Sequence, residues 1–425
     1  MSDPSQSPVP SPQPLDLEAI RRRFPALAAA ERFVFFDNAA GAQVPSTVLA
    51  AVADHLLMRN VQRGGPYRQS REVDAMIGRA RESVAAFVNA RGADEIAFGL
   101  NATSFIRSIS LAIGQELGSS GPAGSSRTEI IVSDLDHESN IATWLALERA
   151  GARIVWWHAR VGEDGARLHP ADLGPLLTDR TRLVACTLAS NATGSLVDVA
   201  EVARRAHAAG AEVFLDAVHY SPHLPIDVQA FDCDYLVCSG YKVFAPHMGF
   251  AWCRREAINR LPTFREDFIP DVTPDKLEAG TYAYENVAGM DAAVAYLEQF
   301  GNGPTRSERI RAAMTAIAAY ERTLSAALLD EVSTVSGLTV HGVTDRARLH
   351  ERVPTVCFSV AGHSAAAIAE GLAARSIGVR SGHMYSPRLM ARLGLHGGAV
   401  RASLVHYNTA AEVARFGAAL REVVG

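Results

Sequence analysis

The sequence predicts an α/β fold: a large domain with a mainly parallel seven-stranded sheet, followed by a smaller α+β C-terminal domain. Two observations support this prediction. Between about residues 95 and 253, short runs typical of strands alternate with longer helical stretches, which is the pattern of a parallel sheet covered by helices. After about residue 274 the pattern changes to long helices followed by a series of strands.

The strands expected in the large sheet are short apolar runs bounded by helical or turn-forming segments. They cover residues 95–100, 129–133, 152–157, 182–188, 212–215, 235–238 and 250–253. Helical stretches lie between them, among them residues 104–117, 140–150 and 199–209. The Gly/Ser-rich connection 118–126 lacks the glycine spacing and the Lys-Ser/Thr pair of a nucleotide-binding loop, so it is expected to be a surface connection.

The C-terminal part contains long helical patterns and short strands. The expected helices are 285–300, 308–331, 365–374 and 410–424, and the expected strands are 338–340, 355–360, 378–381 and 400–407. We therefore expect four parts: a disordered arm (1–14), an N-terminal helix that packs with the small domain (15–32), a large domain (33–275) and a small domain (276–425).

Composition restricts the class of protein. A chain of 425 residues with 48% hydrophobic and 20% charged residues can bury a sizeable core. A formal charge of -5 is small for this length and argues against nucleic acid or anionic membranes as partners. The first 14 residues lack the basic start and apolar core of a signal peptide. No apolar run is long enough to span a bilayer. The five scattered cysteines favour a reducing compartment. We expect a soluble cytoplasmic protein.

Lys242 and Asp216 are the first candidate site residues, because each lies where a predicted strand ends. In a parallel sheet, ligands bind outside the carboxyl ends of the strands. A lysine that forms a Schiff base with pyridoxal 5'-phosphate (PLP), with an acid at the pyridine nitrogen, uses these two groups. A lysine taken alone is more often a solvated surface residue, so other segments must decide between the two interpretations.

Several further segments could belong to the same site. Ala102 and Thr103 lie where a strand runs into a helix, which suits a phosphate, although Thr103 could simply cap that helix. His137 follows the next strand and could stack on a planar ring or be a surface residue. Asn191 could reach a cofactor oxygen or belong to a polar turn. Arg401 could pair bidentately with a substrate carboxylate or form a structural ion pair.

Together these segments resemble the cysteine desulfurase-like branch of the class V aminotransferases, which are fold-type I PLP-dependent enzymes. The resemblance extends from Phe-Asp-Asn-Ala-Ala (36–40) to Arg-Ala-Ser-Leu-Val-His-Tyr-Asn-Thr (401–409). It implies that Lys242 holds PLP, that Asp216 keeps the pyridine nitrogen protonated and that His137 stacks on the ring. It also implies a homodimer with shared active sites.

The resemblance assigns roles to the other candidates as well. His219, where the family often has glutamine, is expected near the phenolic oxygen with Asn191 close by, and Arg401 is expected to bind the α-carboxylate of an amino-acid substrate. Tyr241 stands where desulfurases usually carry histidine. The resemblance implies phosphate contacts from Ala102, Thr103, Ser239 and Tyr241, phosphate contacts to the neighbouring subunit from Gly280 and Thr281, and further substrate contacts from Asn38 and Ala39.

Tyr385 is the main departure from the family pattern. Desulfurases of this type carry a nucleophilic cysteine in a motif like Arg-Thr-Gly-His-His-Cys, whereas residues 380–385 read Arg-Ser-Gly-His-Met-Tyr. No cysteine follows Cys357, which lies in an apolar strand where burial is its expected role. Tyrosine cannot accept sulfur as a persulfide, but it can donate a proton. The sequence thus argues against sulfur transfer by the usual route, and Tyr385 or His383 could protonate a leaving group.

Three arginines lie close together in the segment 62–71. Arg63, Arg68 and Arg71 could bind a second acidic group of a substrate, but a solvated face is the slightly favoured interpretation.

His219 and His223 have the spacing of a helical metal-binding pair. The intervening proline disfavours a helix, and a third ligand is missing, so we expect no metal site.

The sequence therefore predicts a PLP-dependent enzyme acting on an amino acid, with Lys242 as general base at Cα. β-Elimination by a C–S lyase that lacks the persulfide cysteine is the favoured reaction. An aminotransferase, an amino-acid epimerase, a true cysteine desulfurase and a non-catalytic PLP-binding protein are the alternatives. The last is disfavoured because a scaffold has no need for a carboxylate-binding arginine such as Arg401.

Overall fold

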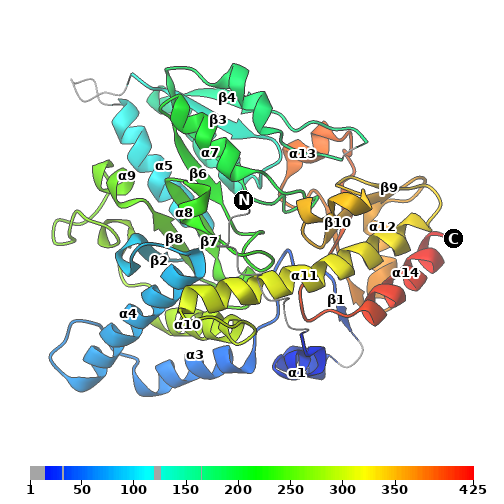
Figure 1. Ribbon diagram of the computed structural model, residues 1–425, viewed down its shortest axis with the longest axis horizontal. Coiled ribbons are helices and arrows are strands. Elements are labelled where there is room, and N and C mark those ends of the chain that lie inside the picture. Colours follow the sequence, from blue (N-terminus) through cyan, green and yellow to red (C-terminus); the bar gives the residue numbers. More distant parts are fainter. Residues whose placement is uncertain (1–14, 31–32, 119–125, 164) are drawn as a thin grey trace, which may run out of the picture.

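The computed structural model describes residues 15–30, 33–118, 126–163 and 165–425, so the expected arm 1–14 lies outside the described residues. Its centre is a seven-stranded sheet (Figure 1). The strands, in spatial order, are β2 (Ile96–Gly99), β8 (Gly249–Cys253), β7 (Tyr235–Ser239), β6 (Glu212–Asp216), β5 (Thr181–Thr187), β3 (Glu129–Ser133) and β4 (Arg153–Trp157). All neighbours are parallel except at β8, which is antiparallel to β2 and β7. The predicted α/β fold with a mainly parallel seven-stranded sheet is confirmed.

Both faces of this sheet are covered by helices, because its strands are apolar at nearly every position. Successive side chains of a strand point to opposite faces, so Val213 and Leu215 of β6 belong to one core and Phe214 to the other. The first core is covered by α4 (Arg68–Val88), α7 (Val199–Ala208) and α10 (Tyr284–Glu298), and the second by α5 (Ala102–Gly118), α6 (Ser139–Leu145) and α9 (Arg255–Arg260).

A second sheet is formed mainly by the C-terminal part of the chain. Its antiparallel strands, in spatial order, are β12 (Arg380–Gly382), β13 (Ala399–Ser403), β10 (Thr355–Val360) and β9 (Leu338–Val340). The helices α11 (Arg306–Ser333), α12 (Ala365–Ala373) and α14 (Ala410–Val424) share its core, and Figure 1 shows α11 running from α10 to this sheet. Close by, β1 (Val34–Phe35) pairs in parallel with β11 (Ile377–Gly378).

The remaining helices are short or lie at the edge of the molecule. They are α1 (Leu17–Arg22), α2 (Pro25–Ala29), α3 (Ser46–Met58), α8 (Val228–Phe231) and α13 (Pro387–Arg392). Among the described helices, none combines the length and apolar character needed to cross a membrane. The domain limits given above stay a prediction.

One strand is shorter than the sequence pattern indicates. The apolar run 400–407 predicts a single strand, but β13 ends at Ser403. The Asn408 side chain accepts a hydrogen bond from Val405 N at 2.9 Å, and Thr409 then begins α14 with a reciprocal cap to Glu412. Local hydrogen bonds between side chains and backbone thus end the strand where hydrophobicity alone would continue it.

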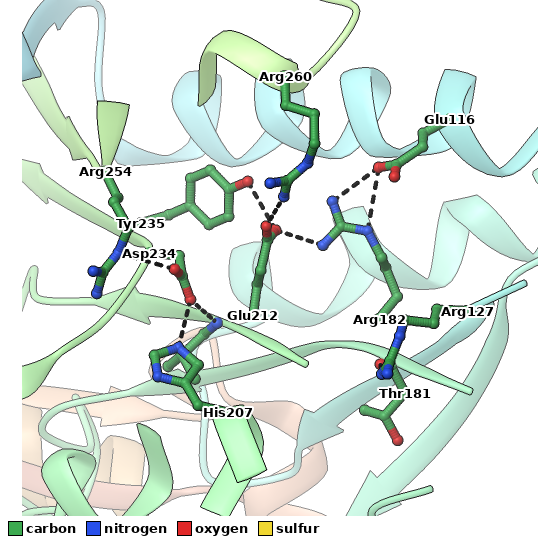
Figure 2. A network of polar contacts seen from close by, with 11 residues as sticks. Glu116, Arg127, Thr181, Arg182, His207, Glu212, Asp234, Tyr235, Arg254 and Arg260 are labelled. Atoms are coloured by element: carbon green, nitrogen blue, oxygen red, sulfur yellow. Dashed lines mark hydrogen bonds and ion pairs between the residues drawn. The ribbon is translucent and has the colours of Figure 1, made fainter. Parts of the chain in front are cut away.

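A network of charged residues lies at the amino ends of the central strands (Figure 2). Arg182 of β5 is buried and donates to Glu116 of α5 at 2.8 Å and to Glu212 of β6. Glu212 also accepts from the Tyr235 hydroxyl at 2.9 Å and from Arg260. Burial lowers the pKa of Arg182, but the two glutamates more than offset this and raise it above its ordinary value. The network therefore holds α5, β5, β6 and β7 together as a charged cluster.

Replacing Glu212 tests this network. Glu212→Ala leaves the buried Arg182 with only part of its counter-charge, so the free energy of unfolding should fall by about 3 kcal/mol in urea denaturation. The control is Glu201→Ala, which removes exposed ion pairs to Arg204 and Arg205 and should cost less than about 1 kcal/mol. Equal losses in the two variants would show that the network adds no more stability than a surface pair.

Candidate functional site

Most of the candidate residues line one cavity of about 390 Å³ at the carboxyl ends of the central strands. Thr187, Asp216 and Ser239 end β5, β6 and β7 at its floor. The lining residues are Ala102, Thr103, His137, Ser139, Thr187, Asn191, Asp216, Val218, His219, Ser239, Tyr241 and Lys242. The parallel topology therefore brings these side chains together, as expected for a sheet of this kind.

Lys242 lies on a short turn directly after β7. The turn closes because Gly240 N donates to Met248 O at 2.7 Å, and a Cβ at Gly240 would lie 2.8 Å from Pro246 O. Burial and the neighbouring Arg401 lower the pKa of Lys242 to about 8, although Asp216 opposes them. A buried amine of lowered pKa has a larger neutral, nucleophilic fraction near neutral pH than an ordinary lysine.

The chain has only one other lysine, Lys276, and its amine is already committed. Lys276 Nζ donates to Leu261 O at 2.9 Å and to Asn259 O at 3.2 Å, and it pairs with Asp271 at 2.8 Å. Lys242 Nζ, by contrast, has no hydrogen-bond partner within the described part of the chain. Lys242 is therefore the lysine available for a Schiff base.

Asp216 and His219 form the deep end of the cavity. Asp216 Oδ1 accepts from Val218 N at 2.9 Å, and burial raises the pKa of this carboxyl, with Val218 and Lys242 opposing. His219 Nε2 lies 3.0 Å from Thr355 Oγ1 of β10, while its Nδ1 is buried with no partner in the described structure. Burial, with His223 and Lys242, holds the pKa of His219 well below its usual value. A buried ring nitrogen without a partner favours a ligand that supplies a polar atom.

The opposite end of the cavity suits an anion. Asn101 Oδ1 accepts from Ser104 N at 2.9 Å, so Asn101 caps α5, and the alternative that Thr103 is the cap is wrong. Ala102 N donates to Ser239 Oγ at 3.0 Å. A helix start with small hydroxyl groups fits a phosphate.

His137 lies between this cavity and a second, outer hollow of about 920 Å³. Its Nδ1 accepts from Ser139 N at 3.1 Å, which fixes the ring. Burial, Lys242 and Arg401 lower the pKa of His137 to about 4, so the ring is neutral near pH 7. A fixed neutral imidazole can stack on a flat ring. Lys242, Asn191 and Tyr241 also line both hollows.

Arg401 lies in the wall of the outer hollow and is 3% exposed. Its Nη1 donates to Asn191 O at 2.7 Å and its Nη2 to Asp37 Oδ1 at 3.0 Å. Its Nε is buried without a partner among the described residues. Burial lowers the pKa of Arg401 while Asp37 opposes this. The guanidinium is fixed in place and keeps an N–H for an anionic group.

Tyr385 is held at the mouth by a constrained backbone. Met384 and Tyr385 have positive φ angles of 48° and 59°, a conformation that non-glycine residues adopt rarely. Asn191 Nδ2 donates to Met384 O at 2.7 Å, Ser386 Oγ donates to Asn191 Oδ1 at 2.9 Å, and Glu138 N donates to Tyr385 O at 2.8 Å. Asn191 thus anchors this loop. The Tyr385 ring, 61% exposed, lies 5.5 Å from that of His137.

Some of the predicted site residues lie elsewhere. Ala39 lines the outer hollow, but Asn38 and His383 line neither hollow. The Asn38 amide donates to Phe35 O at 2.8 Å and Ser403 O at 2.9 Å, so it ties the segment after β1 to β13. His383 Nδ1 accepts from Tyr385 N at 3.0 Å and supports the loop.

Two other segments lie away from both hollows of the single chain. Gly280 and Thr281 line neither of them, and their contact with a neighbouring subunit stays a prediction. In the 62–71 segment, Arg63 lies 3.5 Å from Asp74, and Arg68 donates to Glu72 at 2.7 Å. These ion pairs agree with the solvated face that was favoured for the arginines.

The cysteines are not exposed to the two hollows. All five lie among the described residues, are buried and free, and line neither hollow: Cys186, Cys233, Cys238, Cys253 and Cys357. Burial raises the pKa of each thiol. A thiol of raised pKa without access to a substrate is a poor sulfur acceptor.

The sequence reasoning gave no role to Asp37, Arg380 or Thr355. Asp37 and Arg380 stood inside the quoted family segments, and the signal for their pairing was opposite charge in two motifs about 340 residues apart. The parallel pairing of β1 with β11, just before Asp37 and Arg380, brings these motifs together. Thr355 starts a strand and gave no signal of its contact with His219.

Comparison with known proteins identifies the family of the chain. The family model for class V aminotransferases matches residues 34–416. The chain is 35% identical to the aminotransferase-like protein FGM3 of Gibberella zeae, over 96% of this chain and 98% of that protein. It is 31% identical to a probable cysteine desulfurase of Streptomyces coelicolor, over 94% and 95% of the two chains. The crystal structure of the cysteine desulfurase CsdA from Escherichia coli superposes with a TM-score of 0.82, at 27% identity, over 97% and 99%.

The pKa of Lys242 leads to a prediction for cofactor capture. Since only the neutral amine attacks an aldehyde, the rate at which the apoprotein forms a borohydride-trappable bond with PLP should rise with pH and level off above about pH 8. With a lysine of ordinary pKa, about 10.4, this rate would keep rising until the pH reached that value. Peptide mapping should place the label on Lys242.

The second lysine provides the control. Lys242→Ala should abolish the trapped PLP, whereas Lys276→Met should keep it. Label on Lys276, or a rate that still rises steeply above pH 9, would contradict the assignment.

Proposed function

Because the chain belongs to the class V aminotransferase family, and is therefore a PLP-dependent enzyme, we propose that it catalyses β-elimination from an amino acid, as a C–S lyase without a persulfide cysteine. The observation that carries the proposal is the composition of the mouth. Tyr385 stands there beside Lys242 and Arg401, while all five cysteines are buried elsewhere. A site of this kind can activate Cα and protonate a leaving group, but it has no thiol that could retain sulfur.

The cavity fits the cofactor, because it offers a free amine, an acid, a helix start and a buried ring nitrogen without a partner. When bound, PLP supplies an electron sink that stabilises negative charge at the substrate Cα. Asp216 would hold a proton at the pyridine nitrogen, and His137 would stack on the ring. Thr103 and Ser239 would bind the phosphate.

The substrate is positioned by Arg401 and acted on by two proton-transfer groups. Arg401 binds the α-carboxylate through its remaining N–H and so orients the Cα–H bond. Lys242 Nζ then removes the Cα proton, for which a pKa of about 8 is well matched. The Tyr385 hydroxyl donates a proton to the departing sulfur. Its exposed position at the mouth leaves room for a bulky leaving group.

Transamination is the second candidate, and it is favoured by the 35% identity to an aminotransferase-like protein. In transamination Lys242 would deliver the proton taken from Cα to the bound cofactor, and no group would leave Cβ. Epimerisation would return the proton to Cα. True desulfuration is disfavoured by the buried thiols, and a non-catalytic role by the free Nε of Arg401.

We also propose that the enzyme acts as a homodimer with shared active sites in the cytoplasm. Phe264 and Phe268 support association, because they are 88% and 80% exposed on one loop. Exposed aromatic residues of this kind often mark a protein interface.

Product analysis tests the reaction type. We expect the holoenzyme to convert cysteine, cysteine sulfoxides or cysteine conjugates to pyruvate and ammonia, without persulfide on the protein. A keto acid with aminated cofactor would establish transamination instead. One equivalent of persulfide on any cysteine would overturn the case against desulfuration.

Tyr385→Phe tests the proposed proton donor. The variant keeps the ring against His137 but loses the hydroxyl, so kcat for elimination should fall roughly 100-fold with little change in KM. Tyr67→Phe, which changes another exposed tyrosine, should leave both constants unaltered. If Tyr385→Phe kept its full kcat with a substrate whose leaving group needs protonation, Tyr385 would have no such role.

A further inference from the structure

Asp37 is shared by two arginines at the mouth of the site. Arg380 Nε and Nη2 donate to Asp37 Oδ2 at 2.9 and 2.6 Å, and Arg401 Nη2 donates to Oδ1 at 3.0 Å. Asp37 reaches this position because its backbone bridges to Ser403 of β13. One carboxylate thus joins a buried guanidinium to an exposed one.

The backbone register explains why a shared acid is needed. Arg380 of β12 and Arg401 of β13 are directly opposite each other in an antiparallel pair. Like charges at such positions repel, and Arg401 is almost fully buried, so the repulsion is poorly screened. Asp37 lies between them and compensates both.

The same acid creates a difficulty for an incoming carboxylate. Nη1 of Arg401 is held by Asn191 O, Nη2 is held by Asp37, and only Nε is without a partner among the described residues. A carboxylate that bonds to Nε comes to the side of the guanidinium that adjoins Nη2. Two carboxylates would then share one arginine, which is unfavourable unless another cation compensates Asp37.

We propose that Arg380 is a positioning residue for carboxylate binding: it neutralises Asp37, which can then fix Arg401 without repelling the substrate. The geometry supports this role, because Arg380 places two N–H groups on Oδ2, the oxygen of Asp37 that Arg401 does not bind. Asp37 also raises the pKa of Arg380, so this cation persists. The proposal rests on the assignment of Arg401 to the substrate α-carboxylate, but not on the reaction that follows.

The test measures binding to the holoenzyme without turnover. The probes are 2-methylalanine and tert-butylamine, in which a methyl group replaces the carboxylate, and neither has a Cα proton. Each is titrated by the change in the absorbance of the bound cofactor. Arg380→Met should weaken 2-methylalanine binding roughly tenfold and leave tert-butylamine binding unchanged, because only the carboxylate meets the uncompensated Asp37.

The decisive variant is the double substitution Asp37→Asn with Arg380→Met. Removing the acid together with its counter-charge should restore 2-methylalanine affinity to within about threefold of the unmodified protein. If the double variant stayed as weak as Arg380→Met, Arg380 would be binding the carboxylate itself or serving only the fold, and the proposal would be overturned. Equal weakening of both probes by Arg380→Met would overturn it as well.

Two further variants complete the design. Arg380→Lys keeps the cation and should bind 2-methylalanine within a few-fold of normal, which provides a second test if the double variant is unstable. Arg388→Met removes a comparably exposed arginine that pairs with Glu138 and should leave both affinities unchanged.

Arg401→Met tests the assignment on which this inference rests. If Arg401→Met left 2-methylalanine binding intact, the carboxylate assignment in the proposed function would fail together with this inference. Failure of elimination alone would leave the binding results untouched.

Discussion

The enclosure of two cations, Lys242 and Arg401, in one low-dielectric site is the constraint on which the rest of the structure depends. Both side chains are more than nine-tenths buried, and each lowers the pKa of its neighbours, as His137 and His219 show. Burying two such groups is costly unless each meets an opposite charge. Asp216 and Asp37 meet this need at the two ends of the site.

This constraint explains why both sheets are required. The parallel sheet brings Lys242 and Asp216 to one edge, but Arg401 is not part of this sheet. Arg401 comes from the antiparallel sheet and is held by Asn191 O from the loop after β5, while Thr355 of β10 holds His219. The site is thus built by hydrogen bonds that cross between the two sheets. Displacing one sheet from the other would leave each cation with its counter-charge but would break the hydrogen bonds of Arg401 to Asn191 O and of His219 to Thr355.

Sequence reasoning succeeded where the signal was local and failed where it depended on distance. The central sheet and the position of Lys242 after a strand follow from the apolar runs and their ends. The carboxyl ends of parallel strands lie at the same edge of a sheet, so the strand ends alone predict that Lys242 and Asp216 lie close together. The end of β13 at Ser403 was missed, because a hydrogen bond from Asn408 overrides a continuous apolar pattern.

In the site, the use of Asn191 as an anchor for the Met384–Tyr385 backbone could not be predicted, since nothing in either segment indicates that they touch. The pairing of Asp37 with Arg380 was missed as well, because opposite charge in two motifs so far apart in the sequence does not show that strand pairing brings them together. Residue types therefore predicted which groups belong to the site, while the contacts among those groups had to come from the fold.

The backbone at Tyr385 shows how the fold places this side chain at the mouth of the site. Two consecutive residues in the left-handed region cost of order 1–3 kcal/mol each, and they persist only where surrounding contacts over-determine them. Here Asn191, Glu138 and Ser386 provide these contacts and aim residue 385 at the mouth. These contacts hold residue 385 at the mouth whatever its side chain. The proposed lyase reaction uses the hydroxyl placed there as a proton donor, a role that a tyrosine can fill although it cannot carry sulfur.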